Sequence, residues 1–182
     1  MFFDTETTGI NKQVDRIIQF GAIYGSYDPV KNVFYEERVI NQYIHPWETK
    51  ISPEAHNAHG LNWDFVAQFD TIDKYIKEFL SYMLKCDIIV WHNLDFDWGM
   101  IDSEFHRYWL EHGVFAKRHC TMKTGTDYCK LPGKYGNKRP SLQELHQKLF
   151  DCKFEWAHDA LSDIQATKKC YMQMLELWLF TI

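Results

Sequence analysis

The chain has 182 residues, 46% of them hydrophobic and 25% charged, with a formal net charge of −5 at pH 7. These values predict one globular domain, long enough to bury a substantial core. The negative charge argues against a protein that coats long duplex DNA by neutralising phosphates, although an enzyme that grips one strand end through metal ions remains compatible with it.

The chain opens on two aromatic residues, Phe2 and Phe3, which predict a short strand, and continues with Asp4 and Glu6. Residues two apart along a strand point to the same face, about 6.6 Å apart for a rise of ~3.3 Å per residue. Like charges on one face repel each other, and a bound cation is the usual reason to hold them there. On this fragment alone, a chance pair of solvated acids is an equal alternative. The turn Thr7, Thr8 and Gly9 follows.

A hairpin and a short helix are predicted next. The stretches 16–27 and 32–44 are rich in apolar residues and read as two strands, with a turn signal at Asp28-Pro29 between them. Ser52 followed by Pro53 predicts a helix N-cap and first turn, and His59-Gly60 predicts its end.

A clear amphipathic pattern follows and predicts one helix. Its apolar positions have the spacing i, i+3, i+4, i+7, i+8 and i+11, and they are Ile72, Tyr75, Ile76, Phe79, Leu80 and Met83. Residues 87–91 predict a short strand buried on both faces of an α/β sheet. A helix from about Phe96 to His112 should follow, with Gly113 as its C-cap.

Residues 117–139 differ from the rest of the chain because they hold seven Lys or Arg and one acid. We interpret this segment as partly loop-like, either a solvated loop or a wall that faces phosphates.

A capping box at Ser141 predicts a helix start. The last predicted helix spans 159–178, and its expected buried face is Ile164, Thr167, Tyr171, Leu175 and Trp178.

The apolar end over 179–182 should dock on the core or contact a partner or a missing segment. The order of strands and helices predicts an α/β fold with a mixed sheet and helices on both faces.

Two more acids and one histidine stand at informative places. Asp97 follows the buried strand at a helix start, where α/β sheets place their sites. Asp163 lies in the first turns of the last helix, where the helix dipole favours a carboxylate. Five residues of helix turn about 140° away from one face. His158 therefore reaches the same site only from the loop before that helix.

Together the motifs Asp-x-Glu (4–6), His-Asn-x-x-Phe-Asp (92–97) and His-x-Ala-x-x-Asp (158–163) resemble those of the DEDDh family of 3′–5′ exonucleases. This family includes the proofreading epsilon subunit of bacterial DNA polymerase III and ribonuclease T. A related subgroup places Tyr where this chain has Asp159, so His158 fits the His subgroup. Cys120-Thr121-Met122 departs from the Asp-Thr-Leu of many relatives, and Asp95 is an extra acid that we interpret as a solvated turn residue.

The resemblance implies a ribonuclease-H-like fold with a five-stranded mixed sheet, in a single exonuclease domain over 1–182. It implies release of nucleoside 5′-monophosphates from 3′ ends of single-stranded DNA or RNA, with DNA favoured. The residues it assigns to two divalent ions are Asp4, Glu6, Asp97 and Asp163. Oxygen ligands favour Mg²⁺ or Mn²⁺ over zinc, and two such ions suit phosphodiester hydrolysis.

The resemblance also implies that His158 is the general base, and an imidazole with a pKa near 6.5 suits that role at neutral pH. The residues expected to contact substrate are Thr7, Thr8, Gly9, His59, Leu61, Asn93 and Phe96, of which Phe96 can equally belong to the core. A DNA polymerase subunit is a candidate partner.

The chain shows no membrane span and no signal segment, and its five cysteines have no Cys-x-x-Cys pair. We therefore expect reduced thiols and a cytoplasmic location.

A catalytically silent nucleic-acid or polymerase-binding module of the same fold is the alternative, although the intact set of five residues argues against it. A metal-dependent phosphatase would need a phosphate loop or an Asp nucleophile motif that the sequence lacks. The choice of DNA or RNA depends on local geometry around the sugar. The sequence leaves this choice, the oligomeric state and membership of a longer protein open.

Overall fold

The central sheet has five strands in the order β3-β2-β1-β4-β5 in the computed structural model, which describes residues 1–111, 113, 116–155 and 157–181. The strands are β1 (Phe2–Thr7), β2 (Ile17–Asp28), β3 (Val33–Tyr43), β4 (Ile88–Trp91) and β5 (Lys117–Cys120). β2 runs antiparallel to β1 and to β3, whereas β4 is parallel to β1 and β5 is parallel to β4. The predicted five-stranded mixed sheet is therefore confirmed.

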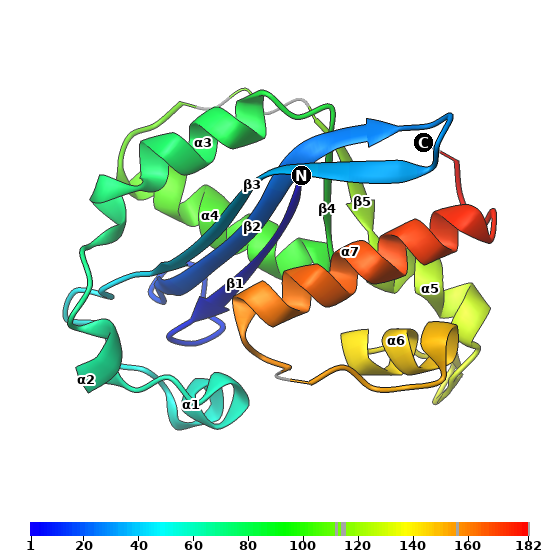
Figure 1. Ribbon diagram of the computed structural model, residues 1–182. Coiled ribbons are helices and arrows are strands. Elements are labelled where there is room, and N and C mark those ends of the chain that lie inside the picture. The colour runs from blue at the N-terminus through cyan, green and yellow to red at the C-terminus, as the bar shows by residue number, and fades with distance from the viewer. Residues whose placement is uncertain (112, 114–115, 156, 182) are drawn as a thin grey trace.

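Helices cover both faces of the sheet (Figure 1). Phe3 and Trp91 face the core formed with α3 (Ile76–Leu84) and α4 (Leu94–Arg107), while Phe2 and Val90 pack against α7 (Ala160–Glu176). Neighbouring residues of a strand point to opposite faces, so the two aromatics at the start of the chain serve two different cores. Helices on both faces are confirmed.

The predicted helix start at Ser52 is confirmed in α1 (Pro53–His59). The Ser52 side chain accepts a hydrogen bond from the Ala55 amide at 3.1 Å, and Gly60 takes the left-handed conformation, with φ of 74°, at the C-cap. This is the usual use of glycine at the end of a helix. A further short helix that we did not predict, α2 (Trp63–Val66), follows with Asn62 as its N-cap.

The predicted helix over 72–83 is divided in two. A 3₁₀ turn, η1 (Ile72–Lys74), comes first, and Tyr75, with φ of −117°, separates it from α3. The apolar stripe is nevertheless buried, since Ile72, Ile76 and Met83 are at most 2% exposed. Hydrophobic spacing thus identified the buried face, because a 3₁₀ turn and an α-helix place residues three apart on similar sides.

The end of α4 was predicted wrongly. The helix ends at Arg107, and Trp109 takes a left-handed conformation with φ of 53° while the Leu110 amide bonds the Phe105 carbonyl at 3.0 Å. This is the closing hydrogen bond of a Schellman motif, with tryptophan where glycine is usual. The predicted C-cap Gly113 therefore lies beyond the helix, and His112 falls outside the described residues.

Residues 117–139 are partly loop-like, as predicted, but the prediction missed a strand and a helix within them. They contain β5, then α5 (Thr121–Cys129), and then the short strands β6 (Pro132–Gly133) and β7 (Gly136–Asn137). The strand KRHC carries no apolar run because it lies at the edge of the sheet, where Lys117 and Arg118 are exposed. Edge strands commonly carry such charges.

The two last helices follow the predicted starts. Helix α6 (Leu142–Phe150) has a complete capping box between Ser141 and Glu144, and Asp159 is the N-cap of α7. The buried face of α7 was partly wrong: Ile164, Thr167 and Tyr171 are buried, but Leu175 is half-buried and Trp178 is 84% exposed beyond the helix end.

In the apolar tail, the Phe180 ring docks against Tyr171, with ring centroids 4.9 Å apart. Ile182 lies outside the described residues. Among the helices of the described part of the chain, none is long and apolar enough to span a membrane.

Candidate active site

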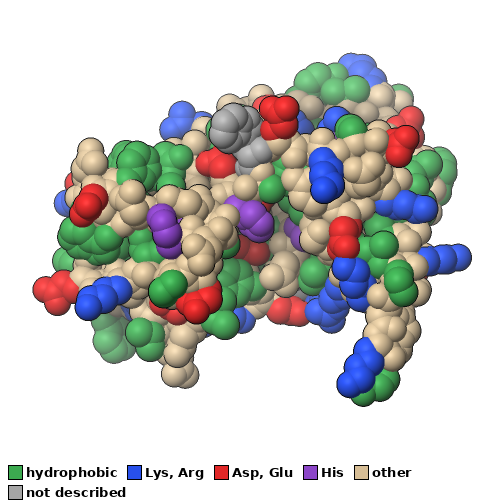
Figure 2. Space-filling model, turned by 90° about the horizontal axis from the view of Figure 1, so that it is seen from below, with side chains coloured by type: hydrophobic (Ala, Val, Ile, Leu, Met, Phe, Trp, Pro, Cys, Tyr) green, Lys and Arg blue, Asp and Glu red, His purple; other side chains and the backbone are tan. Residues whose placement is uncertain are grey.

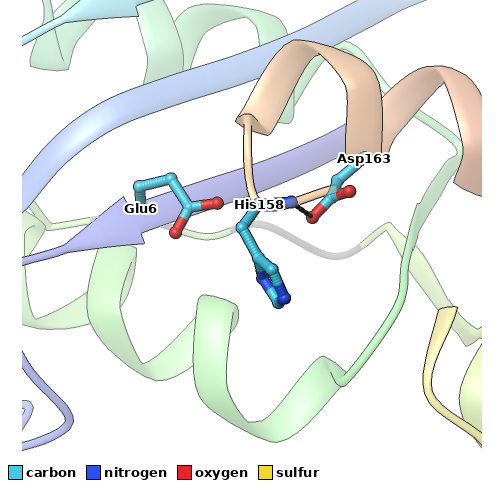
Figure 3. Close-up of side chains that lie close together, drawn as sticks. All are labelled: Glu6, His158 and Asp163. Carbon is cyan, nitrogen blue, oxygen red and sulfur yellow. Dashed lines mark hydrogen bonds between the residues drawn. The ribbon is translucent and has the colours of Figure 1, made fainter. Parts of the chain in front are cut away.

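The carboxyl end of β1 meets the start of α7 at a cluster of three side chains. Ligand atoms of Glu6, His158 and Asp163 all lie within 4.8 Å of one another. Figure 3 shows Glu6 approaching from the strand and Asp163 from the helix, with the His158 ring extending below the two carboxylates. Glu6 is only 9% exposed, whereas His158 is exposed. The cluster therefore combines a buried and a half-buried carboxyl group with an exposed imidazole.

Close packing places the start of α7 over β1 and β2. A Cβ atom on Gly21, which pairs with Asp4 across the sheet, would lie 2.8 Å from the carbonyl carbon of Ala160. The Gln19 amide nitrogen donates to Asp159 Oδ1 at 2.8 Å, and Gln19 Oε1 accepts from the Ala160 amide at 3.3 Å. A larger residue at position 21 would push the helix start, and with it Asp163, away from Glu6.

His158 stands on the loop before α7, which begins after Asp159. Its φ of 67° lies in the left-handed region, and its main-chain amide donates to Asp163 Oδ2 at 3.2 Å. Non-glycine residues seldom adopt this conformation, and they concentrate at sites where the surrounding structure maintains it. His158 thus lies on the loop before α7, the position that helix periodicity requires for its ring to reach the site.

Asp97 reaches the same end of β1 from the opposite face of the sheet. It lies in the first turn of α4 and is 3% exposed, and its Oδ1 accepts hydrogen bonds from the Thr5 amide at 3.2 Å and the Thr5 hydroxyl at 2.7 Å. Thr5 lies between the two acids of β1, so its side chain points to the α4 face. Asp97 is the charged neighbour with the strongest effect on Asp4.

Crowding of carboxyl groups dominates the electrostatics of this site. Burial, followed by repulsion from Asp163 and Asp97, raises the pKa of Glu6 to about 8. Burial also raises the pKa of Asp97 to about 7, although the hydrogen bonds from Thr5 oppose this shift, and that of Asp163 to about 6. Burial and the charge of Asp97 raise the pKa of Asp4 well above its usual range.

These features fit a divalent cation. Four carboxyl groups that repel one another gain most from a positive ion between them. Asp163 Oδ1 is buried and accepts no hydrogen bond within the described part of the chain, so it is available as a ligand. Carboxylate oxygens are the donors that hard divalent cations prefer in proteins.

We expect the cation-free protein to lose thermal stability as the pH rises from about 6.5 to 8.5. Glu6 and Asp97 have pKa values in the folded protein, about 8 and 7, that exceed those of ordinary carboxyl groups. The folded state therefore binds more protons than the unfolded state in this range, and the free energy of unfolding falls as those protons are lost. Thermal melting in EDTA at the two pH values measures the effect, and added Mn²⁺ should reverse it.

The predicted loss of stability begins near pH 6.5. Below that pH, His92 and His119 have the opposite effect, because they make the free energy of unfolding rise with pH. Burial lowers the pKa of both imidazoles to about 4, so their unfolded forms bind protons first as the pH falls. Glu6→Gln is the matched variant: in EDTA at pH 8.5 it should melt at least about 2–4 °C above the wild type, the shift that 1 kcal/mol gives in a protein of this size. Equal melting temperatures for the two proteins would contradict the charge-repulsion account.

The turn over Thr7, Thr8 and Gly9 lies beside the cluster, but its two hydroxyl groups serve the turn itself. The Thr7 hydroxyl donates to the Gly9 carbonyl at 2.8 Å, and the Thr8 hydroxyl donates to Asp15 Oδ1 at 2.8 Å. A Cβ atom on Gly9 would lie 2.6 Å from the Asp15 carboxylate. Both threonines are buried, so any contact of this turn with a ligand would come from its main chain.

The end of α1 packs against the same turn. His59 Nε2 donates to the Thr7 carbonyl at 3.1 Å, and His59 Nδ1 accepts from the Leu61 amide at 3.0 Å, which defines a neutral tautomer. Burial, and to a smaller extent His56 and His158, lowers the pKa of His59, although the hydrogen bond to the Thr7 carbonyl opposes this shift. The structure thus brings His59 and Leu61 to the site.

The remaining candidates lie around the start of α4. Asn93 is exposed and takes the left-handed conformation, with φ of 71°, as the N-cap of α4, whereas Phe96 is half-buried and packs against the core under α3 and α4. Asp95 is exposed, as expected, but it lies in the helix rather than in a turn and pairs with Lys123 at 3.3 Å. Asp95 therefore lies outside the carboxyl cluster.

Three residues that support the site were not among the predicted ones. Thr5 holds Asp97, Asp159 caps α7, and Gln19 ties that cap to β2. The alternation of side chains along β1 could have identified Thr5, because its side chain points to the face covered by α4, the helix that follows β4. No local signal marks Gln19, which is 1% exposed and lies inside an apolar strand.

The chain is similar to known proteins over nearly its whole length. Residues 1–171 match the family described as exonuclease. The chain is 30% identical over 178 residues to the DNA polymerase III subunit epsilon of Salmonella typhimurium, an alignment that covers 94% of this chain and 69% of that protein.

Solved structures of exonuclease I share the fold. One superposes with a TM-score of 0.77 at 20% identity, over 96% of this chain and 40% of that one. Exonuclease I of Escherichia coli in complex with a dT13 oligonucleotide superposes with a TM-score of 0.76 at 20% identity, over 97% of this chain and 42% of that one. The chain thus spans about two fifths of exonuclease I. The family match over nearly the whole sequence, together with the three motifs at one end of β1, shows that this chain belongs to the DEDDh exonuclease family.

Proposed function

We propose that this chain is a 3′–5′ exonuclease that removes nucleoside 5′-monophosphates one at a time from the 3′ end of a single strand. The observation that carries the proposal is the convergence of Glu6, His158 and Asp163 within 4.8 Å at the carboxyl end of β1. Asp4 and Asp97 complete a set of four acids whose pKa values are raised by burial and by their mutual repulsion. A site of this kind is built to hold positive charge.

Asp4, Glu6, Asp97 and Asp163 would hold two divalent cations, Mg²⁺ or Mn²⁺. When bound, such ions lower the pKa of a water molecule and neutralise charge on phosphate oxygens. His158 accepts the proton of the attacking water at a ring nitrogen, and its exposed ring has room to pass that proton to solvent. The water oxygen bonds to phosphorus as the bond from phosphorus to the 3′ oxygen breaks, and solvent protonates the leaving oxygen.

Hydrogen bonds orient two of these acids, and neighbouring groups are placed to contact the nucleotide. Thr5 fixes the direction of the Asp97 carboxylate through two hydrogen bonds, and the His158 amide fixes that of Asp163. The main chain of the 7–9 turn, with His59 and Leu61 behind it, would contact the terminal nucleotide. Preorganised ligands of this kind spare the site from rearranging during the reaction.

We favour DNA as substrate and consider a DNA polymerase subunit a candidate partner. One fold neighbour is described in complex with a dT13 oligonucleotide, and the relative that is 30% identical to this chain is a subunit of DNA polymerase III. Both facts concern those proteins, and they guide the choice of substrates to be tested first.

Digestion of matched substrates tests the proposal. Single-stranded DNA, duplex DNA with a 3′ overhang and single-stranded RNA, each labelled at the 5′ end, should shorten by single nucleotides, with single-stranded DNA fastest. EDTA should stop the release of mononucleotides, and excess Mg²⁺ should restore it. Binding of the labelled strand without any shortening would instead favour the alternative, a catalytically silent module of the same fold.

A further inference from the structure

A basic arm projects beside the carboxyl-cluster end of the molecule. We use the term basic arm for residues 131–139, which fold as the two-stranded hairpin of β6 and β7 and lie outside the main sheet. The Lys138 amide closes the arm at its neck by donating to the Leu131 carbonyl at 3.0 Å. Figure 2 shows an arm with a basic side chain at its tip projecting from the face that is hollowed around histidine and acidic side chains.

The tip of the arm has the chemistry of a nucleotide contact. Tyr135 is 91% exposed, and the Lys134 ammonium lies 5.2 Å from the centre of its ring. A ring with so much exposed surface contributes little to the core, but a free aromatic face can stack on any base. An adjacent ammonium group can pair with the phosphate that follows.

The local charge differs in sign from that of the whole chain. Residues 128–143 contain four cationic side chains and no acid, within a chain of net charge −5. The cationic residues are Lys130, Lys134, Lys138 and Arg139. A protein partner would have to be acidic to match this surface, whereas a nucleic acid supplies both the negative charge and flat rings for Tyr135.

Hydrogen bonds tie the base of the arm to the turn between β4 and α4, the helix that carries Asp97. Pro140, directly after the arm, is buried, and its carbonyl accepts a hydrogen bond from His92 Nε2 at 3.1 Å. His92 lies at the carboxyl end of β4, next to the N-cap of α4, and its Nδ1 accepts from the Thr121 hydroxyl at 2.9 Å. The base of the arm and the start of α4 are therefore both held at the carboxyl end of β4.

A second anchor fixes the arm to α6. The Lys138 ammonium pairs with Glu144 at 2.5 Å, and the same carboxylate accepts from the Ser141 amide at 2.8 Å. Lys138 therefore serves the base of the arm, and Lys134, Tyr135 and Arg139 remain exposed for a ligand. An arm held at its base and open at its tip suits a contact with a flexible chain.

We propose that the basic arm binds the single strand upstream of its 3′ end, with Tyr135 stacked on a base and with Lys134 and Arg139 on phosphates. This inference rests on the proposed exonuclease function and adds a second contact region to it. The arm should raise affinity for strands long enough to reach it and should leave the chemistry at the carboxyl cluster unchanged.

The test compares a long and a short substrate with the double variant Lys134→Ala/Tyr135→Ala. The p-nitrophenyl ester of thymidine 5′-monophosphate has one nucleotide and cannot reach the arm, whereas a DNA strand of about 16 nucleotides can. Loss of one stacked base should raise KM for the long strand about tenfold, while kcat/KM for the ester stays at the wild-type value. Removal of one phosphate contact should also lower the salt dependence of binding, the slope of log K against log[salt], by about 0.7.

The matched control is Lys31→Ala/Tyr35→Ala. These residues form the same kind of contact, with the ammonium 5.9 Å from the ring centre, on the hairpin of β2 and β3. That hairpin turn lies at the other end of the sheet, since β1 pairs its first residue, Phe2, with Ile23 and its last, Thr7, with Ile17. The control should behave as the wild type on both substrates.

The outcomes separate the two proposals. If the wild type cleaves neither substrate, the exonuclease proposal fails, and fluorescence anisotropy with the labelled strand still tests the arm. Equal KM and equal salt dependence for the wild type and the arm variant would overturn the arm proposal, as would equal affinities by anisotropy. Digestion of the long strand by the arm variant with wild-type kinetics at every salt concentration would likewise overturn it.

Discussion

Asp97→Asn is expected to slow the digestion of single-stranded DNA by about 10³-fold or more, because a ligand charge worth several kcal/mol in the transition state is lost. The substitution should leave the fold intact. Asp97 Oδ1 accepts two hydrogen bonds from Thr5, and an amide oxygen can accept both. In EDTA at pH 8.5 the variant should even melt at a higher temperature than the wild type, because a buried acid with a pKa raised to about 7 is charged at that pH and has been replaced by a neutral group.

Asp95→Asn provides the matched control for this substitution. Asp95 lies two residues earlier on the same helix, but its side chain is 63% exposed and pairs with Lys123 at the surface. Exposed pairs of this kind contribute little to stability, so activity and melting temperature should stay close to those of the wild type. Digestion by Asp97→Asn at a rate near that of the wild type, measured from initial rates on a labelled strand, would refute the role assigned to Asp97.

His158→Ala is the second substitution with a large expected effect. Loss of a general base typically lowers rates by about 10²–10⁴-fold. The main-chain amide that bonds Asp163 Oδ2 is retained in this variant, so the position of Asp163 should be preserved. Single-turnover rates in excess Mg²⁺ measure the loss, and melting temperatures show whether the fold is kept.

The pH dependence separates a base from a structural residue at this position. A base must be unprotonated to accept a proton, so the wild-type rate in saturating Mg²⁺ should rise with pH and then level off, as expected for an imidazole. In His158→Ala this rise should vanish, and added imidazole should restore part of the rate. A wild-type rate that is flat from about pH 5 to 8 would remove His158 as the base.

The corresponding control is His106→Ala. His106 lies on α4, its side chain is 76% exposed, and it is 3.6 Å from Asp102 one turn earlier. Its substitution should change neither the rate nor its pH dependence. If both histidine variants lost activity to the same extent, the loss in His158→Ala would reflect a general effect on stability.

Features that depend on neighbouring residues could be predicted from the sequence. The alternation of β1 places Asp4 and Glu6 on one face, and the capping box at Ser141 begins a helix through hydrogen bonds within four residues. The position of His158 before α7 also followed from helix periodicity, because a residue five positions earlier within the helix would face elsewhere. The family resemblance supplied the fifth strand, which the pattern KRHC did not reveal.

The tertiary structure decided features that depend on residues distant in the chain. Thr5 and Asp97 are 92 positions apart, and only the packing of α4 against the sheet brings the hydroxyl to the carboxylate. The end of α4 at Arg107 likewise depends on the left-handed conformation of Trp109, which its residue type does not favour.

The sequence by itself identified the candidate residues for the chemistry, because the three motifs specify an Asp-Glu pair, a later Asp, and a His five residues before the last Asp. Only the tertiary structure decided how these groups affect one another. Burial and mutual repulsion raise the pKa of Glu6 to about 8, and both depend on distances that no local pattern contains. It also showed that the threonines of the 7–9 turn are committed to the turn, since Asp15 and the Gly9 carbonyl take their hydrogen bonds.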